Sequence, residues 1–373
     1  MPSRRRAIVA VTNDLATDNR VHRTCMALQG SGYDVLLLGR RLGGSPDLDR
    51  PYATRRMRLF FQRGPLFYAE FNARCSLFLL FRRCELIVAN DLDTLLAAYL
   101  ASRFRSVPLV YDTHELFTEV PELIGRPIAR GVWLRIERWI FPRLRHVITV
   151  NASIARIYRE KYGVEVGVVR NIPMPRVLDA APSRKELGLP LDRFILILQG
   201  AGINVDRGGE EAVMAMERLP GCLLLIVGGG DAWPELERLV RMLGLQERVR
   251  LIGRLPYARM MDLTRNADLG LTLDKDTNPN YRYSLPNKLF DYLNAGIPIV
   301  CSDLPEVARI VRGCDAGVVI PVVDPREIAE AVEALRRDPA RMEALRANAT
   351  FAARKLDGGL EYAALKDFLK GIG

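Results

Sequence analysis

Short apolar runs, many of them rich in β-branched residues, alternate with longer amphipathic segments along the whole chain. The amphipathic segments repeat their apolar positions every three or four residues and predict helices, whereas the short runs predict buried strands. Strands that alternate with helices are typical of a parallel sheet covered by helices on both faces. In the first half the pattern predicts strands at 7–11, 34–38, 59–62, 86–89, 108–111, 146–150 and 166–169, and helices at 19–29, 94–104, 129–144 and 153–162.

The second half repeats this pattern after residues 171–191, which contain four prolines. We therefore predict an α/β protein with two doubly wound Rossmann-like domains, at 1–175 and 191–356, joined by a linker at 176–190. The C-terminal helix, 357–373, is expected to pack back on the first domain. The later strands are expected at 194–198, 222–227, 249–252, 269–273, 297–301 and 317–320, and the closing helices at 326–337, 342–355 and 360–368.

The composition supports a globular protein of the cytoplasm. The chain has 373 residues, of which 49% are hydrophobic and 26% charged, and this length suits two domains. Six cysteines are scattered without a Cys-x-x-Cys pair, which favours reduced thiols over disulfides or a metal site. The first apolar run is too short for a signal peptide, and no run approaches the roughly 18 apolar residues of a membrane span.

The positive charge is concentrated in the first half of the chain. Residues 1–172 carry 27 basic and 16 acidic side chains, and the remainder carries 27 and 28. This asymmetry suggests an anionic partner such as a membrane surface or a phosphorylated lipid, although an arginine-rich solvated surface would look the same. The apolar segment 75–81, flanked by arginines, could be an interfacial helix or could cover a sheet. No stacking platform accompanies the basic residues, which argues against nucleic acid.

Polar residues follow the predicted strands at the edge where doubly wound sheets bind ligands. His114 comes directly after a buried strand and could donate a hydrogen bond to a sugar hydroxyl or transfer a proton. Asp91 and Asp93 form an Asp-x-Asp pair, as do Asp274 and Asp276, and such a pair can bind a metal. In the first pair, Asp91 or Asp93 could instead cap the helix that follows. We predict no metal site. The other polar residues at this edge in the first half are Asn13, Asp14, Asn90, Asp112 and Glu115.

Segment 283–302 reads as a short helix followed by a buried strand. Pro286 and Asn287 are expected to start the helix, with Asn287 as the N-cap, and Gly296 is expected to end it. Lys288 and Asp291 then lie beside a helix N-terminus that favours an anion such as a diphosphate. The alternative is a surface ion pair between these two side chains on a helix of the core.

Two glycine-containing loops also end predicted strands. The loop 200–209 carries Arg207, whose guanidinium suits bidentate contact with a phosphate. The loop 228–231 allows close approach of a ligand, although its glycines could simply form a tight turn. Neither loop follows the Gly-x-Gly-x-x-Gly or the Walker pattern, which argues against a dehydrogenase and against a P-loop enzyme.

Taken together, these segments resemble the family 4 glycosyltransferases, which have the GT-B fold. The resemblance runs along nearly the whole chain. It is carried by Thr12-Asn-Asp-Leu-Ala-Thr-Asp-Asn-Arg-Val-His-Arg23, Asn90-Asp-Leu-Asp-Thr94, Tyr111-Asp-Thr-His-Glu115, Asp206-Arg-Gly208 and Leu285-Pro-Asn-Lys-Leu-Phe-Asp-Tyr292.

The resemblance implies transfer of a sugar from a nucleotide-diphosphate donor to a glycan or lipid-linked acceptor, with retention at the anomeric carbon and with no metal or cofactor. It implies that Arg207 and Lys288 contact the diphosphate, that Asp291 binds the ribose and that His114 contacts the transferred sugar. The acceptor side would include Asn13, Asp14, Asn90, Asp91, Asp112 and Glu115. The implied donor-binding residues are Gly202, Arg207, Gly229, Tyr283, Ser284, Leu285, Asn287, Lys288 and Asp291.

Two positions depart from the pattern of these enzymes. Many members have a glutamate eight residues before the ribose-binding carboxylate, where this chain has Tyr283, and many have paired glycines where it has Asn13 and Asp14. Two other functions therefore remain open. One is a sugar-nucleotide epimerase on the same fold, and the other is a non-catalytic subunit that binds a nucleotide.

Overall fold

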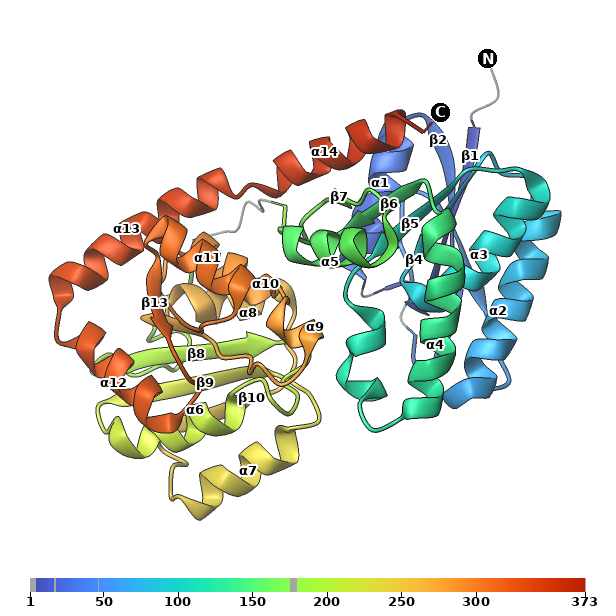
Figure 1. Ribbon diagram of the computed structural model, residues 1–373. Helices are drawn as coiled ribbons and strands as arrows, with labels where there is room; N and C mark the ends of the chain where they lie inside the picture. Colours follow the sequence, from blue (N-terminus) through green and yellow to red (C-terminus); the bar gives the residue numbers. More distant parts are fainter. Residues whose placement is uncertain (1–4, 17, 46, 175–179, 373) are drawn as a thin grey trace. The chain divides into compact units, whose positions relative to one another are not determined.

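The chain forms two compact units, which are described separately (Figure 1). The computed structural model describes residues 5–16, 18–45, 47–174 and 180–372. The first unit comprises residues up to 171 together with those from 359 onward, and the second comprises 172–358. Of the linker expected at 176–190, residues 176–179 lie outside the described residues.

The first unit is built on a parallel sheet of seven strands in the order β3-β2-β1-β4-β5-β6-β7. The chain leaves the central strand in one direction toward β3 and then returns to the other side of β1 with β4. In sheets of this kind ligands bind beside the carboxyl ends of the strands at such a reversal, which here are those of β1 and β4. The strands are β1 (Arg5–Asp14), β2 (Tyr33–Arg40), β3 (Ala53–Met57), β4 (Leu86–Asn90), β5 (Leu109–Thr113), β6 (His146–Thr149) and β7 (Gly167–Val168).

Helices cover both faces of this first sheet. On one face, α1 and α14 pack through Val21, Leu28 and Leu365 against strand residues such as Val9 and Val88. On the other, α2, α3 and α4 form a layer in which each helix packs on the next (Figure 1). The helices are α1 (Asn19–Gly30), α2 (Gly64–Phe81), α3 (Leu92–Arg105), α4 (Pro127–Ile140), α5 (Ala152–Tyr162) and α14 (Gly358–Lys370), with short 3-10 turns η1 (Phe117–Glu119), η2 (Pro121–Leu123) and η3 (Phe141–Arg143).

The second unit contains a parallel sheet of six strands in the order β10-β9-β8-β11-β12-β13. The order again reverses beside its first strand, so that the carboxyl ends of β8 and β11 are the expected ligand-binding edge of this sheet. Both sheets bear out the prediction of a parallel α/β fold in each half. The strands are β8 (Phe194–Gly200), β9 (Cys222–Gly228), β10 (Val249–Ile252), β11 (Leu269–Thr272), β12 (Ile299–Ser302) and β13 (Gly317–Ile320).

Two apolar clusters lie on the two faces of this second sheet. One joins α6, α7 and α12 to the strands through Val213, Leu236 and Ile328, and the other joins α8, α10 and α11 through residues that include Leu289 and Val307. The helices are α6 (Gly209–Ala215), α7 (Trp233–Met242), α8 (Tyr257–Arg265), α9 (Pro279–Arg282), α10 (Asn287–Ala295), α11 (Pro305–Cys314), α12 (Pro325–Arg336) and α13 (Pro339–Lys355), with the 3-10 turn η4 (Met216–Arg218).

The strand expected at 59–62 is wrong. The third strand is instead Ala53–Met57, an edge strand that pairs only with β2 and therefore needs no continuous apolar pattern. The phenylalanines that suggested a strand, Phe60 and Phe61, are exposed. Their backbone N–H groups donate to the carboxylate of Glu70, at 2.9 and 3.0 Å to Oε2.

No helix among the residues that the structure describes is long and apolar enough to cross a lipid bilayer.

Candidate functional site

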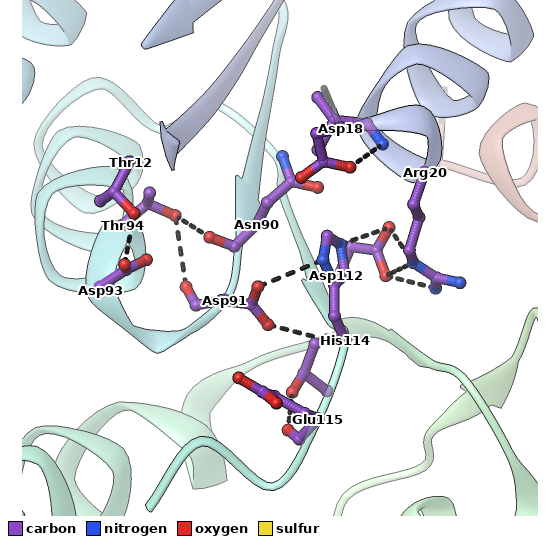
Figure 2. Close-up of polar contacts among 12 residues, drawn as sticks. Thr12, Asp18, Arg20, Asn90, Asp91, Asp93, Thr94, Asp112, His114 and Glu115 are labelled. Atoms are coloured by element: carbon purple, nitrogen blue, oxygen red, sulfur yellow. Dashed lines mark hydrogen bonds and ion pairs between the residues drawn. The ribbon is translucent and has the colours of Figure 1, made fainter. Parts of the chain in front are cut away.

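At the carboxyl ends of β4 and β5, the carboxylate of Asp91 is directed toward His114 (Figure 2). Asp91 has a positive φ of 58° with a ψ of 168°, and its backbone N–H donates to the carbonyl of Asp112 at 3.0 Å. Its carboxylate accepts the backbone N–H of His114 at 2.8 Å and lies 3.2 Å from the ring Nδ1. Asp91 occupies the N-cap position of α3 without a side-chain capping bond. The capping role expected for Asp91 or Asp93 is thus wrong for Asp91, because its carboxylate is used by His114.

His114 lies between two carboxylates. Its Nε2 is 3.7 Å from Oδ2 of Asp112, on the side opposite Asp91. Burial alone would lower the pKa of His114, but Asp91 and then Asp112 outweigh burial and raise that pKa to about 9. The ring is therefore protonated at neutral pH. In this state both of its nitrogens are donors, and it is not a proton-accepting base.

Arg20, which the sequence analysis did not single out, holds Asp112 in place (Figure 2). Its Nε lies 3.1 and 3.2 Å from the two carboxylate oxygens, and Nη2 lies 2.5 Å from Oδ1. Its Nη1 donates to the carbonyl of Val169 at 2.7 Å. Although burial opposes the charge of Asp112, Arg20 and His114 hold the pKa of that carboxyl well below its usual range. The available signal was helical spacing, since Arg20 shares a face of α1 with the buried Thr24 and Ala27.

Most of the remaining polar residues near His114 make hydrogen bonds within the chain. Asn90 is fully buried and donates to the carbonyl of Ala10 at 2.9 Å. Asp93 accepts the hydroxyl of Thr12 at 2.5 Å, which ties β1 to the start of α3. Burial, followed by the charge of Asp91, raises the pKa of Asp93 to about 7. The carbonyl of Glu115 accepts the hydroxyl of Thr113 at 2.8 Å.

The two polar residues at the end of β1 lie apart from the His114 cluster. Asp14 accepts the backbone N–H of Ala16 at 3.0 Å and the hydroxyl of Ser45, and it pairs with Arg56 at 3.1 Å. Asn13 is exposed. Asp14 thus joins the end of β1 to the segments that follow β2, whereas Asp91, Asp112 and His114 are brought together as one cluster.

In the second unit, Arg207 and Lys288 converge on one buried carboxylate, Asp274. Nη1 of Arg207 and Nζ of Lys288 lie 3.3 and 3.7 Å from the same Oδ1. Asp274 and Lys288 are 1% and 8% exposed, and the guanidinium of Arg207 stacks 4.4 Å from the ring centre of Tyr281. Two cations share one anion, so the cluster has surplus positive charge.

The pKa shifts of the two cations differ in direction. Burial lowers the pKa of Lys288, and the pull of Asp274 does not restore it because Arg207 adds repulsion. Burial also opposes the charge of Arg207, but Asp274 and Tyr281 outweigh it and raise the pKa of Arg207. An anion that entered the cluster would relieve the repulsion between the two cations.

Asp291 lies on α10, one turn after Lys288, and is held by two donors. Its carboxylate accepts Nε2 of Gln199 at 3.1 Å and the hydroxyl of Tyr257 at 2.8 Å. Because Lys288 and Asp291 are buried and have these other partners, the alternative of a surface ion pair between them is wrong. Gln199, at the end of β8, was detectable as a polar residue that closes an apolar strand.

The start of α10 differs from the sequence expectation, and its end does not. Pro286 is the N-cap, and Asn287 is the first helical residue, without the capping role predicted for it. Asn287 is exposed. Gly296 ends the helix in the left-handed conformation, with φ of 68°, as expected.

The two glycine loops of the second unit are packed against each other. The N–H of Ile203 donates to the carbonyl of Gly229 at 2.8 Å, and a Cβ at Gly228 or Gly230 would lie 1.8 or 2.1 Å from a backbone oxygen. These two glycines are therefore required by the turn itself. A Cβ at Gly202 would make only ordinary contacts, and one at Gly229 would meet the side chain of Arg254 at 3.3 Å.

Residues 283–285 connect the short α9 to α10. Tyr283 follows α9, and the guanidinium of Arg282 lies 5.9 Å from the centre of its ring. The hydroxyl of Ser284 is buried and has no hydrogen-bond partner among the residues described. Leu285 packs against the apolar cluster beneath α10. Ser284 thus has a buried hydroxyl that the described residues leave without a hydrogen bond, four residues before Lys288.

The described part of the chain contains no group of three or more His, Cys, Asp or Glu side chains that could hold a metal ion. In the second Asp-x-Asp pair, Asp274 faces Arg207 and Lys288, whereas Asp276 pairs with the exposed Arg282 at 2.5 Å. The two carboxylates therefore serve different cations of the chain itself.

Comparison with known proteins matches a glycosyltransferase family model to each unit. The family model "Glycosyltransferase Family 4" matches residues 17–175, and "Glycosyl transferases group 1" matches 210–338. A D-inositol 3-phosphate glycosyltransferase of Xylanimonas cellulosilytica is 26% identical over 291 residues, which cover 73% of this chain and 68% of that protein.

Solved structures agree over nearly the whole chain. Sucrose-phosphate synthase from Thermosynechococcus elongatus has a TM-score of 0.81 at 19% identity and covers 99% of both chains. HepE of Anabaena, in complex with UDP-glucose, has a TM-score of 0.75 at 17% identity and covers 98% of this chain and 100% of its own. The architecture is thus the GT-B fold, and with the two family matches the conclusion follows that the chain belongs to the family 4 glycosyltransferases.

Proposed function

We propose that the protein transfers a sugar from a nucleotide-diphosphate donor to a glycan or lipid-linked acceptor, with retention at the anomeric carbon. The observation that carries the proposal is the pair of cations, Arg207 and Lys288, on the single buried carboxylate Asp274. A buried cluster with surplus positive charge favours an anion, and a diphosphate would supply one. The UDP-glucose complex of HepE is a further reason to use uridine nucleotides as the first probes.

The nucleotide is assigned to the second unit. Asp291, whose carboxylate is held in place by Gln199 and Tyr257, would accept the ribose hydroxyls. Gly202, Gly229, Tyr283, Leu285 and Asn287 complete the proposed donor surface, and the unpartnered hydroxyl of Ser284 provides a further polar contact beside the diphosphate.

The reaction needs charge stabilisation more than a protein base. As the bond between the anomeric carbon and the diphosphate breaks, Arg207 and Lys288 would stabilise the charge that develops on the leaving group. The acceptor hydroxyl forms its bond to the anomeric carbon on the same face, and its proton passes to the leaving phosphate oxygen. His114 would donate a hydrogen bond to the sugar, in agreement with a ring that is protonated at neutral pH. The proposal requires no metal and no cofactor besides the donor substrate.

The proposal is tested with purified protein, a panel of UDP-, GDP-, ADP- and dTDP-sugars, and a lipid and glycan extract as the acceptor. Release of the nucleotide diphosphate and labelling of the acceptor are measured. Arg207→Ala and Lys288→Ala should each lower kcat/KM by about 10²- to 10³-fold. Arg282→Ala is the matched control, because Arg282 is exposed, lies at the end of the neighbouring helix α9 and pairs with Asp276. Its activity should stay within about twofold.

Other outcomes separate the remaining candidates. Isomerised sugar nucleotide formed from the donor alone would identify an epimerase. A thermal shift with UDP but no turnover with any donor and acceptor would identify a nucleotide-binding subunit. Full activity of both Arg207→Ala and Lys288→Ala would overturn the site assignment.

A further inference from the structure

The outer layer of the first unit has an unusually apolar exterior. In α2, Phe67, Phe71 and Leu79 are buried, yet Leu77 and Phe81 are 57% and 85% exposed. A helix that is apolar on both sides is expected to be covered on both sides. Large exposed apolar residues on α2, α3, α4 and the segments that lead into α2 and α4 are Phe60, Phe61, Leu66, Leu77, Phe81, Leu100, Phe104, Ile124, Ile128, Val132 and Trp139.

These side chains form stripes along neighbouring helices. Leu77 and Phe81 lie one turn apart on α2, as do Leu100 and Phe104 on α3 and Ile128 and Val132 on α4. The three helices pack side by side (Figure 1). Trp139 of α4 contacts Tyr99 of α3 edge to face, with ring centres 5.6 Å apart. We call the outward sides of α2, α3 and α4, with Phe60 and Phe61, the outer helical face.

The outer helical face carries no exposed acid on its helices. The helices α2, α3 and α4, all within the described part of the chain, contain only three acidic residues. Asp93 and Glu137 are buried. Glu70 pairs with Arg74 at 2.8 Å and accepts the backbone N–H groups of Phe60 and Phe61. Exposed arginines on these helices or directly beside them are Arg63, Arg82, Arg83, Arg103, Arg126, Arg135 and Arg138.

Surface helices of the second unit look different. On α7, Arg238 pairs with Glu235 at 2.6 Å, and on α12, Arg326 pairs with Glu330 at 2.7 Å. These helices mix the two signs of charge, as is usual for a surface in contact with water. Among the described residues, exposed acids are absent from α2, α3 and α4 themselves, although Glu85 and Glu122 are exposed in the neighbouring segments, and the apolar stripes with their arginines are a feature of these three helices.

We propose that the outer helical face docks on a lipid bilayer that contains anionic headgroups. The apolar stripes would enter the boundary between headgroups and acyl chains, and the arginines at the helix ends would contact lipid phosphates. A second copy of the chain is a poorer occupant, because it would bring the same arginines into contact with one another. Nucleic acid would supply the charge but would leave the leucine, isoleucine and valine stripes without an apolar partner.

The proposal is tested by co-sedimentation of the purified protein with vesicles, and it does not depend on the identity of donor or acceptor because the vesicles contain neither. Vesicles of phosphatidylcholine alone are compared with vesicles that also contain phosphatidylglycerol, at low and high ionic strength. The protein should bind the anionic vesicles at low salt and dissociate at high salt. Binding that is equal for the two compositions, or absent from both, would overturn the proposal.

Substitutions locate the face. Phe81→Ser combined with Phe104→Ser should weaken partition by about tenfold or more, because both rings would be buried in the interface. Arg83→Ser combined with Arg103→Ser should weaken it at low salt by about fivefold for each charge. The matched controls are Phe351→Ser, which removes an exposed phenylalanine of α13, and Arg326→Ser on α12. Both controls should bind as the unmodified protein does.

Two results would count against the outer helical face. Equal loss of binding in Phe351→Ser and in the Phe81 and Phe104 variant would show that exposed aromatic residues act without regard to place. Sedimentation velocity without vesicles provides the second check. A concentration-dependent dimer that disappears in the Phe81 and Phe104 variant would assign the face to a second copy of the chain. Circular dichroism and thermal unfolding confirm that each variant is folded.

Discussion

Each of the two units gathers charged side chains at the carboxyl ends of its strands, but the two clusters differ in how their charge is balanced. In the first unit Asp112 is matched by Arg20 and Asp91 by the protonated ring of His114. In the second unit the single carboxylate of Asp274 faces both Arg207 and Lys288. The charges of the first cluster balance one another within the chain, whereas the second cluster has surplus positive charge.

This difference separates positioning from binding. The carboxylates of the first cluster fix the orientation and the charge of His114, so that its ring N–H groups are held as donors, as the proposed contact with the sugar requires. The cations of the second cluster are held together against their mutual repulsion by Asp274 and by packing, and an anion would complete the cluster. The first cluster should therefore respond to substitution through stability and pH, and the second should also respond to added anions.

The largest expected effect is that of Asp112→Asn. The substitution leaves the guanidinium of Arg20 buried without a counter-charge, which should lower the free energy of unfolding by about 3–5 kcal/mol. Urea denaturation measures this loss, and added pyrophosphate should not restore it. Asp303→Asn is the control, because Asp303 and Arg312 form an exposed pair at 2.8 Å that should contribute less than about 1 kcal/mol. A comparable loss in the two variants would contradict the role given to Arg20.

A second prediction concerns pH and His114. The folded pKa of about 9 lies above the usual value of 6.5, so the stabilisation from the charged ring is fully present below pH 6.5. It is lost as pH rises through 9, by about 3 kcal/mol in all. Unfolding free energies of the protein and of His114→Gln, measured between pH 6 and pH 10, should converge as the pH rises.

His146 provides a control of opposite sign for this titration. Burial and then the charge of Arg145 lower the pKa of His146, so its contribution is lost as pH falls. The difference between the protein and His146→Gln should therefore shrink toward low pH. An NMR titration in which His114 loses its proton near pH 6.5 would contradict the balance of charge described for the first cluster.

The fold was largely predictable from the sequence because both sheets are parallel and buried. Their strands are short apolar runs, and residues such as Gly296 end helices through a conformation that glycine adopts readily. The strand predicted at 59–62 was wrong for the opposite reason. The true strand, Ala53–Met57, is an edge strand whose arginines are partly exposed, so its sequence carries no apolar pattern.

The site was predictable only in part, because the pattern along the chain does not show what lies across the sheet. His114 was recognisable because it directly follows a predicted strand, and Lys288 because it lies at the start of a predicted short helix. The partners Arg20 and Asp274 come from elements 92 and 14 residues away from the residues that they hold, Asp112 and Lys288. Only strand order brings them together, and a single sequence does not specify which polar residues meet.

Asp274→Asn tests the difference between the two clusters, and its expected effect on the free energy of unfolding is of intermediate size. Loss of the shared carboxylate leaves two cations in repulsion and should lower the free energy of unfolding by about 2 kcal/mol, less than Asp112→Asn because the ion pairs are longer. Unlike the first cluster, this one should recover when pyrophosphate or UDP is added, since a ligand at a hundred times its Kd stabilises by about 2.7 kcal/mol. Urea denaturation with and without pyrophosphate measures the recovery, and Arg207→Ala should abolish it. Pyrophosphate that stabilised Asp112→Asn equally would show that it binds elsewhere.

The smallest effect is expected at Asp276, the second carboxylate of the pair that could have held a metal. Its partner Arg282 is 49% exposed and Asp276 itself 47%, so water screens their attraction and Asp276→Asn should change the free energy of unfolding by less than about 1 kcal/mol. Because Asp276 faces Arg282 and Asp274 faces the buried cations, the substitution should change kcat/KM by less than about twofold and should leave any response to Mg²⁺ as it was. Activity is measured with and without EDTA, beside Asp274→Asn. A large loss in Asp276→Asn that added Mg²⁺ reversed would mean that the two carboxylates act together on a metal, which would contradict the proposal that Arg207 and Lys288 bind an anion beside Asp274.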